Sequence, residues 1–397
     1  MDPVVPHAVG VGPPTPDGTG RRRPDPRARR LAQIILSKTL RVARGESVTI
    51  DTWSGTLPWA NAFVFECHRM GALPTLLFRD EPTFWDAASA GNPRSLGSDH
   101  SGELAMLERT DAYVDFWGPS DIAREAALPS AFHERRSKSL EKWWAVANRI
   151  GLRLAVLYLG RIGAKAASSY GVAAGSWSRE LVEASLVDPV GMDRAGRRLA
   201  ARLKIGSEVT IDHPNGTHLK LRLKGRSPFV FGGLLETPER PPRGTLGVRR
   251  KVVETPIPAG YVNVAVDEEF AEGRFVSNVP AELSVAGPDR LDGGVWEFSE
   301  GRLVHQSYRR EPKWFHESYE RGGSGHDRVA LLDIGLNPKI RRAPWMRDQR
   351  LGTVTVAIGG NRYFGGTNGT EFRANLHLTG ATVRIDGTTV VQGNRLR

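Results

Sequence analysis

Three polar residues near the carboxyl end of the chain have the spacing of one face of a β-strand. Side chains alternate along an extended strand, so Arg373, Asn375 and His377 share a face. Arginine offers a rigid fork of donors to a carboxylate or phosphate, asparagine both donates and accepts hydrogen bonds, and histidine can carry a proton. This set predicts a site that recognises an anion by charge and hydrogen bonding.

Two neighbouring apolar segments carry polar residues with the same period. Asp333 shares a face with Leu331, and Thr355 shares one with its neighbours two residues away. Generic catalytic signatures are absent, since the sequence has no Walker A loop, no Gly-x-Ser-x-Gly elbow and no His-Glu-x-x-His. The single cysteine, Cys67, excludes a disulfide framework and any cysteine-based zinc site.

The composition limits the class of protein. With 397 residues, 40% hydrophobic and 25% charged, the chain is an ordinary globular sequence of two or three domains. The net charge of +11 comes partly from arginines at the end of a Pro/Gly-rich stretch, so we expect residues 1–24 to be a disordered basic tail. No nucleic-acid-binding signature accompanies it, and no apolar run is long enough to span a bilayer. We expect a cytoplasmic protein with no specific nucleic-acid partner and no membrane partner.

The order of apolar and amphipathic segments predicts two domains. In residues 25–205, amphipathic helices alternate with short, continuously apolar strands, including one at 74–78 that we expect to be buried. This alternation predicts βαβ units with a mostly parallel sheet. From residue 206 to 397 short strands and turns dominate, beginning with a hairpin around Asn215–Gly216. The predicted fold class is therefore an α/β N-terminal domain followed by a β-rich (α+β) C-terminal domain that carries the site.

Several segments, taken in order, resemble one family, the thermophilic-type metallo-aminopeptidases (leucyl aminopeptidase or aminopeptidase T proteins). Residues 41–50 (RVARGESVTI) resemble the family's first helix-to-strand turn, and residues 211–226 resemble its Pro-x-Gly-Thr-x-Leu hairpin. Residues 257–262 (IPAGYV) are similar to a Pro-Ala-Gly-Glu step, and residues 333–338 (DIGLNP) to a Gly-Ile-Gly-x-Asn-Pro segment. Residues 351–361, 364–366 and 383–387 resemble its closing strands.

The resemblance implies a homodimer with an enclosed cavity and two divalent ions, such as zinc or cobalt, that activate water for amide hydrolysis. The family's ligands are two Glu, two His and an Asp, with a Tyr nearby. The matching positions of this chain hold Tyr261, Leu331, Thr355, Arg362 (beside Tyr363), Arg373 and Asn375. Such a set cannot hold two cations, because zinc and cobalt need carboxylates and imidazoles. The sequence therefore predicts that no metal cofactor is used.

If the family's geometry holds, the replacements converge on the former metal cavity. We expect Arg362, Tyr363, Arg373 and Asn375 to bind a small carboxylate- or amide-bearing substrate. Tyr261, Thr355 and His377 would be the catalytic residues. The alternative is a purely structural role, in which Arg373 forms an ion pair with Asp333 or Glu371 and fills the space of the former metal site.

Three functional hypotheses remain open. The first is an aminopeptidase-like enzyme with a metal-free site. The second is a non-catalytic, anion-binding pseudoenzyme. The third is a divergent aminopeptidase with relocated metal ligands, built on Asp333 and His377 with one of His305, His316 or His326. A related branch of the fold, an iron-dependent ring-cleaving dioxygenase of dihydroxypyridine breakdown, uses a single metal. Segment 309–321, rich in aromatic residues, is either a lid or an amphipathic surface segment.

Overall fold

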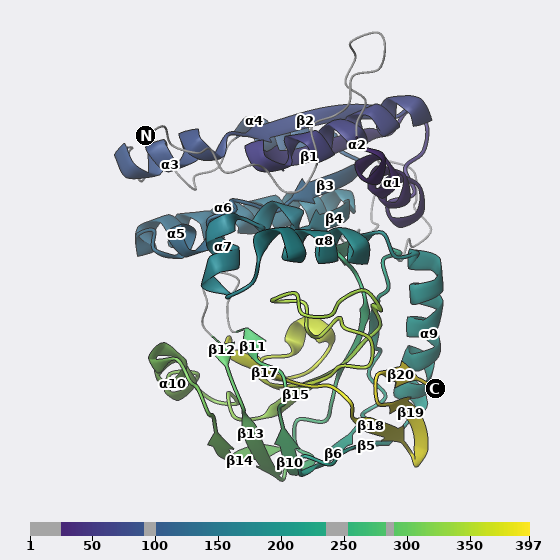
Figure 1. The fold of residues 1–397 in the computed structure, drawn as a ribbon, viewed down its shortest axis with the longest axis vertical. Helices are drawn as coiled ribbons and strands as arrows, with labels where there is room; N and C mark the ends of the chain where they lie inside the picture. The colour runs from purple at the N-terminus through teal and green to yellow at the C-terminus, as the bar shows by residue number, and fades with distance from the viewer. Residues whose placement is uncertain (1–24, 91–100, 236–252, 283–289) are drawn as a thin grey trace. The chain divides into compact units, whose positions relative to one another are not determined.

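A computed structural model describes residues 25–90, 101–235, 253–282 and 290–397 (Figure 1). The predicted basic tail, residues 1–24, lies outside the described residues. The chain divides into two compact units: residues up to Asp188 with Gly233–Pro258, and Pro189–Gly232 with Ala259–Arg397. The expected domains were 25–205 and 206–397. In this division the helix Pro189–Ile205 belongs to the second unit and the strand Val253–Ile257 to the first.

The first unit is built on a five-stranded parallel sheet, in the order β2-β1-β3-β4-β8. In Figure 1 the labels of β2, β1, β3 and β4 follow one another in this order. The predicted α/β domain with a parallel sheet is therefore confirmed. Its strands are β1 (Ser47–Trp53), β2 (Leu73–Arg79), β3 (Ala112–Phe116), β4 (Arg153–Leu157) and β8 (Val253–Ile257).

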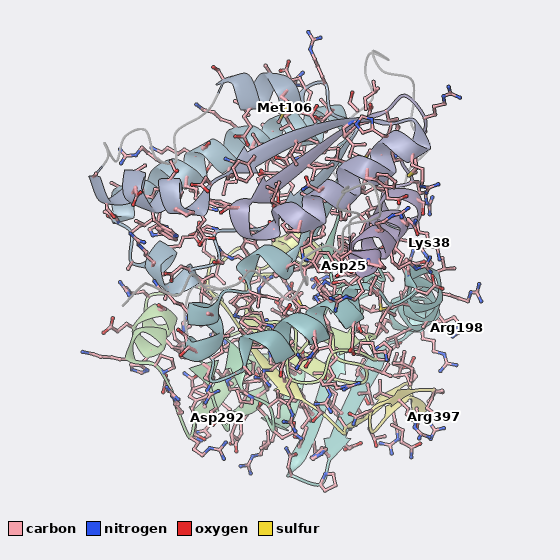
Figure 2. All side chains as sticks on the ribbon, turned by 45° about the horizontal axis from the view of Figure 1, so that its top comes forward. Asp25, Lys38, Met106, Arg198, Asp292 and Arg397 are labelled. Carbon is pink, nitrogen blue, oxygen red and sulfur yellow. The ribbon has the colours of Figure 1, made fainter. Side chains whose placement is uncertain are left out.

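Helices connect the parallel strands, and the sequence explains where several of them begin and end. Asp25, labelled in Figure 2, caps the first helix by accepting a 2.6 Å hydrogen bond from the backbone N–H of Arg27. Gly71 ends the second helix with a φ of 76°, a left-handed conformation that glycine adopts without strain. The helices are α1 (Pro26–Ile34), the π-helix η1 (Ile35–Thr39), the 3-10 helix η2 (Ser54–Thr56), α2 (Leu57–Met70), α3 (Glu81–Ala90), α4 (Ser101–Leu107), α5 (Ile122–Ala126), α6 (Ser130–Ile150), the 3-10 helix η3 (Tyr158–Arg161), α7 (Ala164–Ser169) and α8 (Ala174–Ser185).

One expectation for this sheet is wrong. The apolar segment at 74–78 forms the middle of strand β2, but the strand is not buried, and Leu73, Leu76 and Phe78 are exposed. The physical reason is its position, because β2 is the edge strand and pairs only with β1. The continuous apolar run therefore correctly predicted a strand, but it wrongly predicted that the strand is buried.

The second unit contains two larger antiparallel sheets, which confirms the predicted β-rich part of the fold. An eight-stranded sheet has the order β14-β13-β10-β6-β5-β18-β19-β20, and Figure 1 shows the labels from β14 to β5 side by side in that order. The predicted hairpin is formed by β5 and β6. The strands are β5 (Glu208–His213), β6 (Thr217–Arg222), β10 (Ala271–Val276), β13 (Val295–Ser299), β14 (Arg302–Ser307), β18 (Thr382–Ile385), β19 (Thr388–Gln392) and β20 (Arg395–Leu396).

The second sheet of this unit has five strands in the order β17-β16-β15-β9-β7. Strands β15 and β16 are buried along their whole length, so the sheet lies in the core of the unit. Its strands are β7 (Phe229–Phe231), β9 (Tyr261–Ala265), β15 (Val329–Gly335), β16 (Val354–Gly359) and β17 (Arg373–Leu378). The second unit also contains a two-stranded ladder, formed by β11 (Ala281–Glu282) and β12 (Arg290–Leu291). Its helices are α9 (Pro189–Ile205), α10 (Lys313–Glu320) and the 3-10 helix η4 (Arg362–Phe364).

Helix α9 contains a glycine, Gly196, in its interior. Gly196 is helical and buried, and a Cβ atom built on it would lie 2.6 Å from a methyl group of Val230 on β7. The glycine therefore allows helix and strand to approach closely. Within the described ranges, no helix combines the length and the apolar composition that crossing a bilayer requires.

Candidate functional site

A row of polar side chains crosses the five-stranded sheet of the second unit. Backbone pairing places Asn263 opposite Asp333, Asp333 opposite Thr355, and Thr355 opposite His377. Residues directly opposite each other point to the same face of a sheet, so the four side chains form one line. The ring nitrogen Nδ1 of His377 and the hydroxyl of Thr355 are 2.8 Å apart, and the amide of Asn263 donates to Oδ1 of Asp333.

The charges of this row follow from its burial. Burial, reinforced by the Asp348 carboxylate, raises the pKa of Asp333 to about 8, although the hydrogen bond from Asn263 and the charge of Arg373 oppose the shift. Burial also lowers the pKa of the His377 imidazole to about 3, and the charge of Arg347 adds to this effect. At neutral pH Asp333 is thus a protonated acid and His377 a neutral imidazole. The row is a polar network without net charge.

The predicted arginines come together in a cavity of about 880 Å³ in the same unit. Arg362 and Arg373 both line it, together with Arg321 at the end of helix α10. The lining also includes one carboxylate, Glu371, and the ring of Phe315. Three guanidinium groups against one carboxylate leave an excess of positive charge, which favours an anionic ligand.

Two of these arginines are not neutralised by a neighbouring carboxylate. Among the residues that the structure describes, neither Arg362 nor Arg373 forms an ion pair, and the suggested pairing of Arg373 with Asp333 or Glu371 is not seen. Arg373 instead lies over the ring of Phe364, 5.6 Å from its centroid. Arg321 is held by Glu317, through a 3.0 Å bond to the backbone carbonyl and a 3.9 Å contact with the carboxylate. Both predicted arginines therefore remain available to a ligand.

The position of Arg362 depends on an adjacent glycine. A Cβ atom on Gly369 would lie 2.4 Å from the central carbon of the Arg362 guanidinium, so the group rests directly on the glycine backbone. Asn361 anchors the same loop by donating to Glu268 at 2.9 Å and by accepting from the N–H of Asn368 at 3.0 Å. These bonds fix the turn from which Arg362 projects.

The carboxylate of Glu268 binds several of the groups that hold this loop in place. It accepts hydrogen bonds at 2.6 and 2.8 Å from Arg226, at 2.9 Å from Asn361, and at 2.8 Å from the backbone N–H of Thr367. Burial alone would raise the pKa of the Glu268 carboxyl, but these bonds outweigh it and hold the pKa at about 2. Glu268 therefore stays ionised at all physiological pH values and positions the loop.

The remaining predicted residues are spread along the sheet. Tyr261 lies on β9 beyond Asn263, stacked on Phe231 with ring centroids 4.5 Å apart. Arg373 lies beyond the polar row in the opposite direction, on β17. The pairing thus places Tyr261 and Arg373 on opposite sides of the row, and neither Tyr261, Thr355 nor His377 is among the residues that line the arginine cavity.

Asn375 and Tyr363 occupy different surroundings. Asn375 shares the face of Arg373 and His377, and its side-chain oxygen is buried without a hydrogen-bond partner in the described structure. Such an atom costs free energy unless a ligand or water satisfies it. Tyr363 is 60% exposed and packs edge-on against Phe364. The predicted set therefore separates into an arginine cavity and a buried polar row.

A metal ion fits these residues poorly. Across the described part of the chain, no group of three or more His, Cys, Asp or Glu side chains is arranged to hold one. The fallback ligands Asp333 and His377 are separated by Thr355, and their neighbours in the row are an amide and a hydroxyl. Zinc, cobalt and iron sites need more carboxylate or imidazole donors than this row supplies.

Solved structures with the same architecture were found by structural comparison. AmpT from Thermus thermophilus superimposes with a TM-score of 0.69 at 15% identity, covering 93% of this chain and 98% of its own. The chain has an aminopeptidase-like fold. The 2,5-dihydroxypyridine dioxygenase from Pseudomonas putida KT2440 has a TM-score of 0.57 at 15% identity, covering 94% of this chain and 96% of its own. No family model matches the sequence, and no curated protein matches it.

Sequence reasoning missed Arg321, Glu268 and the asparagine anchors. Within segment 309–321, suggested as a lid or surface segment, Lys313–Glu320 form helix α10, which buries Phe315, and Arg321 follows the helix and lines the cavity. The aromatic residues of this segment indicated that it packs against another part of the chain. The neighbouring sequence did not indicate which part. Glu268 carried no signal, because its partners are 42, 93 and 99 residues away in the sequence.

Proposed function

We propose that this chain is a metal-free enzyme that acts on a small carboxylate- or amide-bearing substrate held by Arg362 and Arg373. The observation that carries the proposal is that both guanidinium groups line one cavity and neither pairs with a carboxylate in the described structure. Guanidinium groups bind carboxylates through parallel charge-assisted hydrogen bonds. Arg321 adds a third positive charge, whereas the carboxylate of Glu371 repels negative charge placed next to it.

The other proposed residues have roles that their surroundings allow. His377 is neutral at physiological pH, so it acts by orienting the Thr355 hydroxyl through their 2.8 Å contact. We propose Tyr261 as a proton donor or acceptor only for a substrate that reaches across the polar row from Arg373, and the unsatisfied oxygen of Asn375 as an acceptor for its N–H. The donors present do not suit a metal ion, so no step is assigned to one. We further propose that the protein is a homodimer, as the sequence resemblance implies.

One observation favours a non-catalytic binding protein as the second candidate. His377 and Thr355 are buried, lie outside the lining of the arginine cavity, and His377 has a pKa of about 3. An imidazole with so low a pKa is a weak base at neutral pH. The same arginines would then bind an anionic metabolite without turnover.

The decisive experiment combines ligand binding with chelation. Succinate and its uncharged analogue succinamide are titrated by calorimetry into the metal-analysed protein, before and after treatment with a chelator. We expect succinate to bind more tightly than succinamide, which has no negative charge, and we expect the chelator to change neither binding nor the melting temperature. Arg373→Gln and Arg362→Gln should each weaken succinate binding about tenfold or more, the usual value of one charge-assisted hydrogen bond.

The control is Arg395→Gln, which removes an equally charged, exposed arginine from strand β20 outside the cavity. Its binding should match that of the unaltered protein. Equal weakening by Arg395→Gln would mean that bulk charge, and not the cavity, attracts succinate. Stoichiometric metal whose removal lowers the melting temperature would overturn the metal-free assignment. Release of amine from carboxylate-bearing amides distinguishes the enzyme from the binding protein.

A further inference from the structure

The first unit contains a separate cavity of about 780 Å³, bounded by one face of the parallel sheet and by helices α3 and α6. Asp51 of β1 and Asp115 of β3 are paired directly opposite each other and form part of its floor. Both lie toward the carboxyl ends of their strands, where open parallel sheets characteristically bind ligands. Trp143 and Trp144 of α6 pack on the same face of β3 and β4.

The walls of this cavity are rich in aromatic rings. Trp53 and Phe84 meet edge to face with centroids 5.4 Å apart, and Trp117 and Tyr158 do so at 5.1 Å. Trp143 is held against Tyr113 at 5.4 Å. Rings fixed by edge-to-face contacts present rigid apolar and π surfaces to a ligand. Such walls suit a flat apolar body or a cation.

Most charged groups around the cavity already have partners. Asp51 accepts two bonds from Arg79, at 2.9 and 3.0 Å, and one from the Tyr113 hydroxyl at 2.9 Å. Arg79 also donates to Glu103 at 2.9 Å. These bonds tie both the carboxylate and the guanidinium to the wall and leave neither as the principal contact for a ligand.

The second arginine near the floor is also engaged. Arg136 pairs with Glu125, and Arg161 donates to the same carboxylate at 2.6 Å. Asp115 differs from all of these groups. In the described structure its carboxyl has no hydrogen-bond or ion-pair partner, although it lies among aromatic rings. A carboxylate in that position is stabilised by a cation that enters the cavity.

We propose that this cavity binds a small protonated amine with an aromatic or apolar body, and that Asp115 is the counter-ion of its ammonium group. The rings of Trp53 and Trp143 would cover the apolar body and supply cation–π attraction, whereas the ring of Trp117 already carries the guanidinium of Arg161, 4.5 Å from its centroid. The cavity belongs to a different compact unit from the arginine cavity, so this site is independent of the proposed function.

The ionisation of Asp115 gives this site a pH dependence. Burial, followed by the nearby charge of Asp51, raises its pKa to about 7, while the charges of Arg79, Arg136 and Arg161 oppose the shift. Below pH 7 the carboxyl is mostly protonated and cannot balance an ammonium charge. Amine affinity should therefore increase as the pH rises through 7, over a range in which an alkylamine stays protonated.

The test uses the full-length protein and three matched probes that differ in one polar end group. These are 2-phenylethylamine, the neutral 2-phenylethanol and the anionic 3-phenylpropionate, each titrated by calorimetry below and above pH 7. We expect the amine to bind more tightly than the alcohol, the anion to bind least, and only the amine to gain affinity with rising pH. Asp115→Asn should weaken amine binding about tenfold or more and bring it to the level of the alcohol.

Two further variants keep the outcome interpretable. Asp86→Asn changes an exposed aspartate of α3 that does not line the cavity and should bind the amine normally. Ala87→Phe fills the cavity from the same helix and should abolish binding of both amine and alcohol, with thermal melts confirming that each variant is folded. Amine binding that survives Asp115→Asn, tighter binding of 3-phenylpropionate, or no amine binding at millimolar concentrations would each overturn the proposal.

Discussion

Asp333 shows how one buried side chain couples folding to pH. In the folded protein its carboxyl has a pKa of about 8, compared with the ordinary value of 3.8 expected in the unfolded chain. Between these values the folded state holds a proton that the unfolded state has released. Raising the pH from 3.8 to about 8 therefore lowers the free energy of unfolding. The contribution of Asp333 to stability is fully present only below the pKa of the unfolded chain.

We predict that Asp333→Asn removes this dependence, because an amide keeps the hydrogen bond with Asn263 but does not titrate. Relative to the unaltered protein, the variant should gain stability as the pH rises from about 5 to about 8. Urea unfolding at the two pH values measures the difference, and Asp86→Asn is the control. A difference between variant and unaltered protein that is the same at both pH values would show that Asp333 is ionised in the folded state.

The close contact of α9 with the five-stranded sheet is a feature of whole elements. Replacing Gly196 by alanine favours the helix by about 1 kcal/mol through backbone entropy. The new methyl group would, however, lie 2.6 Å from Val230 and 3.0 Å from Leu336, and such overpacking costs about 1–3 kcal/mol. We predict that steric strain dominates and that Gly196→Ala lowers the free energy of unfolding.

Gly175→Ala in helix α8 is the matched control, since the nearest atom to its new Cβ would be a flexible arginine nitrogen 3.7 Å away. This variant should be neutral or slightly more stable. Denaturant unfolding of both variants separates packing from helix propensity. If both glycines respond alike, the contact between α9 and β7 is looser than the structure shows.

Elements were easier to predict than their surroundings. The hydrophobic pattern identified strands β1, β3, β4, β15 and β16 because each carries several apolar residues and is buried over nearly its whole length. The same signal could not distinguish the exposed edge strand β2 from a central one. At the site, the alternation along β17 predicts that Asn375 and His377 share a face, but the sequence could not show that Arg321 lines the same cavity as Arg362 or that Glu268 binds Asn361, because those contacts are set by tertiary structure.

The chain leaves the first compact unit, forms part of the second, and then returns to complete the first. Residues up to Asp188 form most of the first unit, yet its fifth strand, β8, comes from Val253–Ile257, after the chain has built part of the second unit. Strand β8 pairs along all five residues of β4. Without it, β4 would be a mostly apolar strand of five residues with an open edge.

We predict that a fragment of residues 25–188 is unstable and aggregates. Joining residues 253–258 to it through a flexible linker restores the missing pairing and should give a soluble protein with a cooperative melt. Light scattering and circular dichroism of the two fragments provide the comparison. A stable, monomeric 25–188 fragment would show that β8 contributes little to the sheet.

The late arrival of β8 also has a consequence during synthesis. A ribosome that has released β1 to β4 must still translate α9 and the β5–β6 hairpin before the strand that closes the first sheet leaves the exit tunnel. The nascent chain therefore carries an unpaired apolar edge while the second unit is only partly made. Chaperone demand should be greatest in this interval, and translational pausing within residues 189–252 would prolong it.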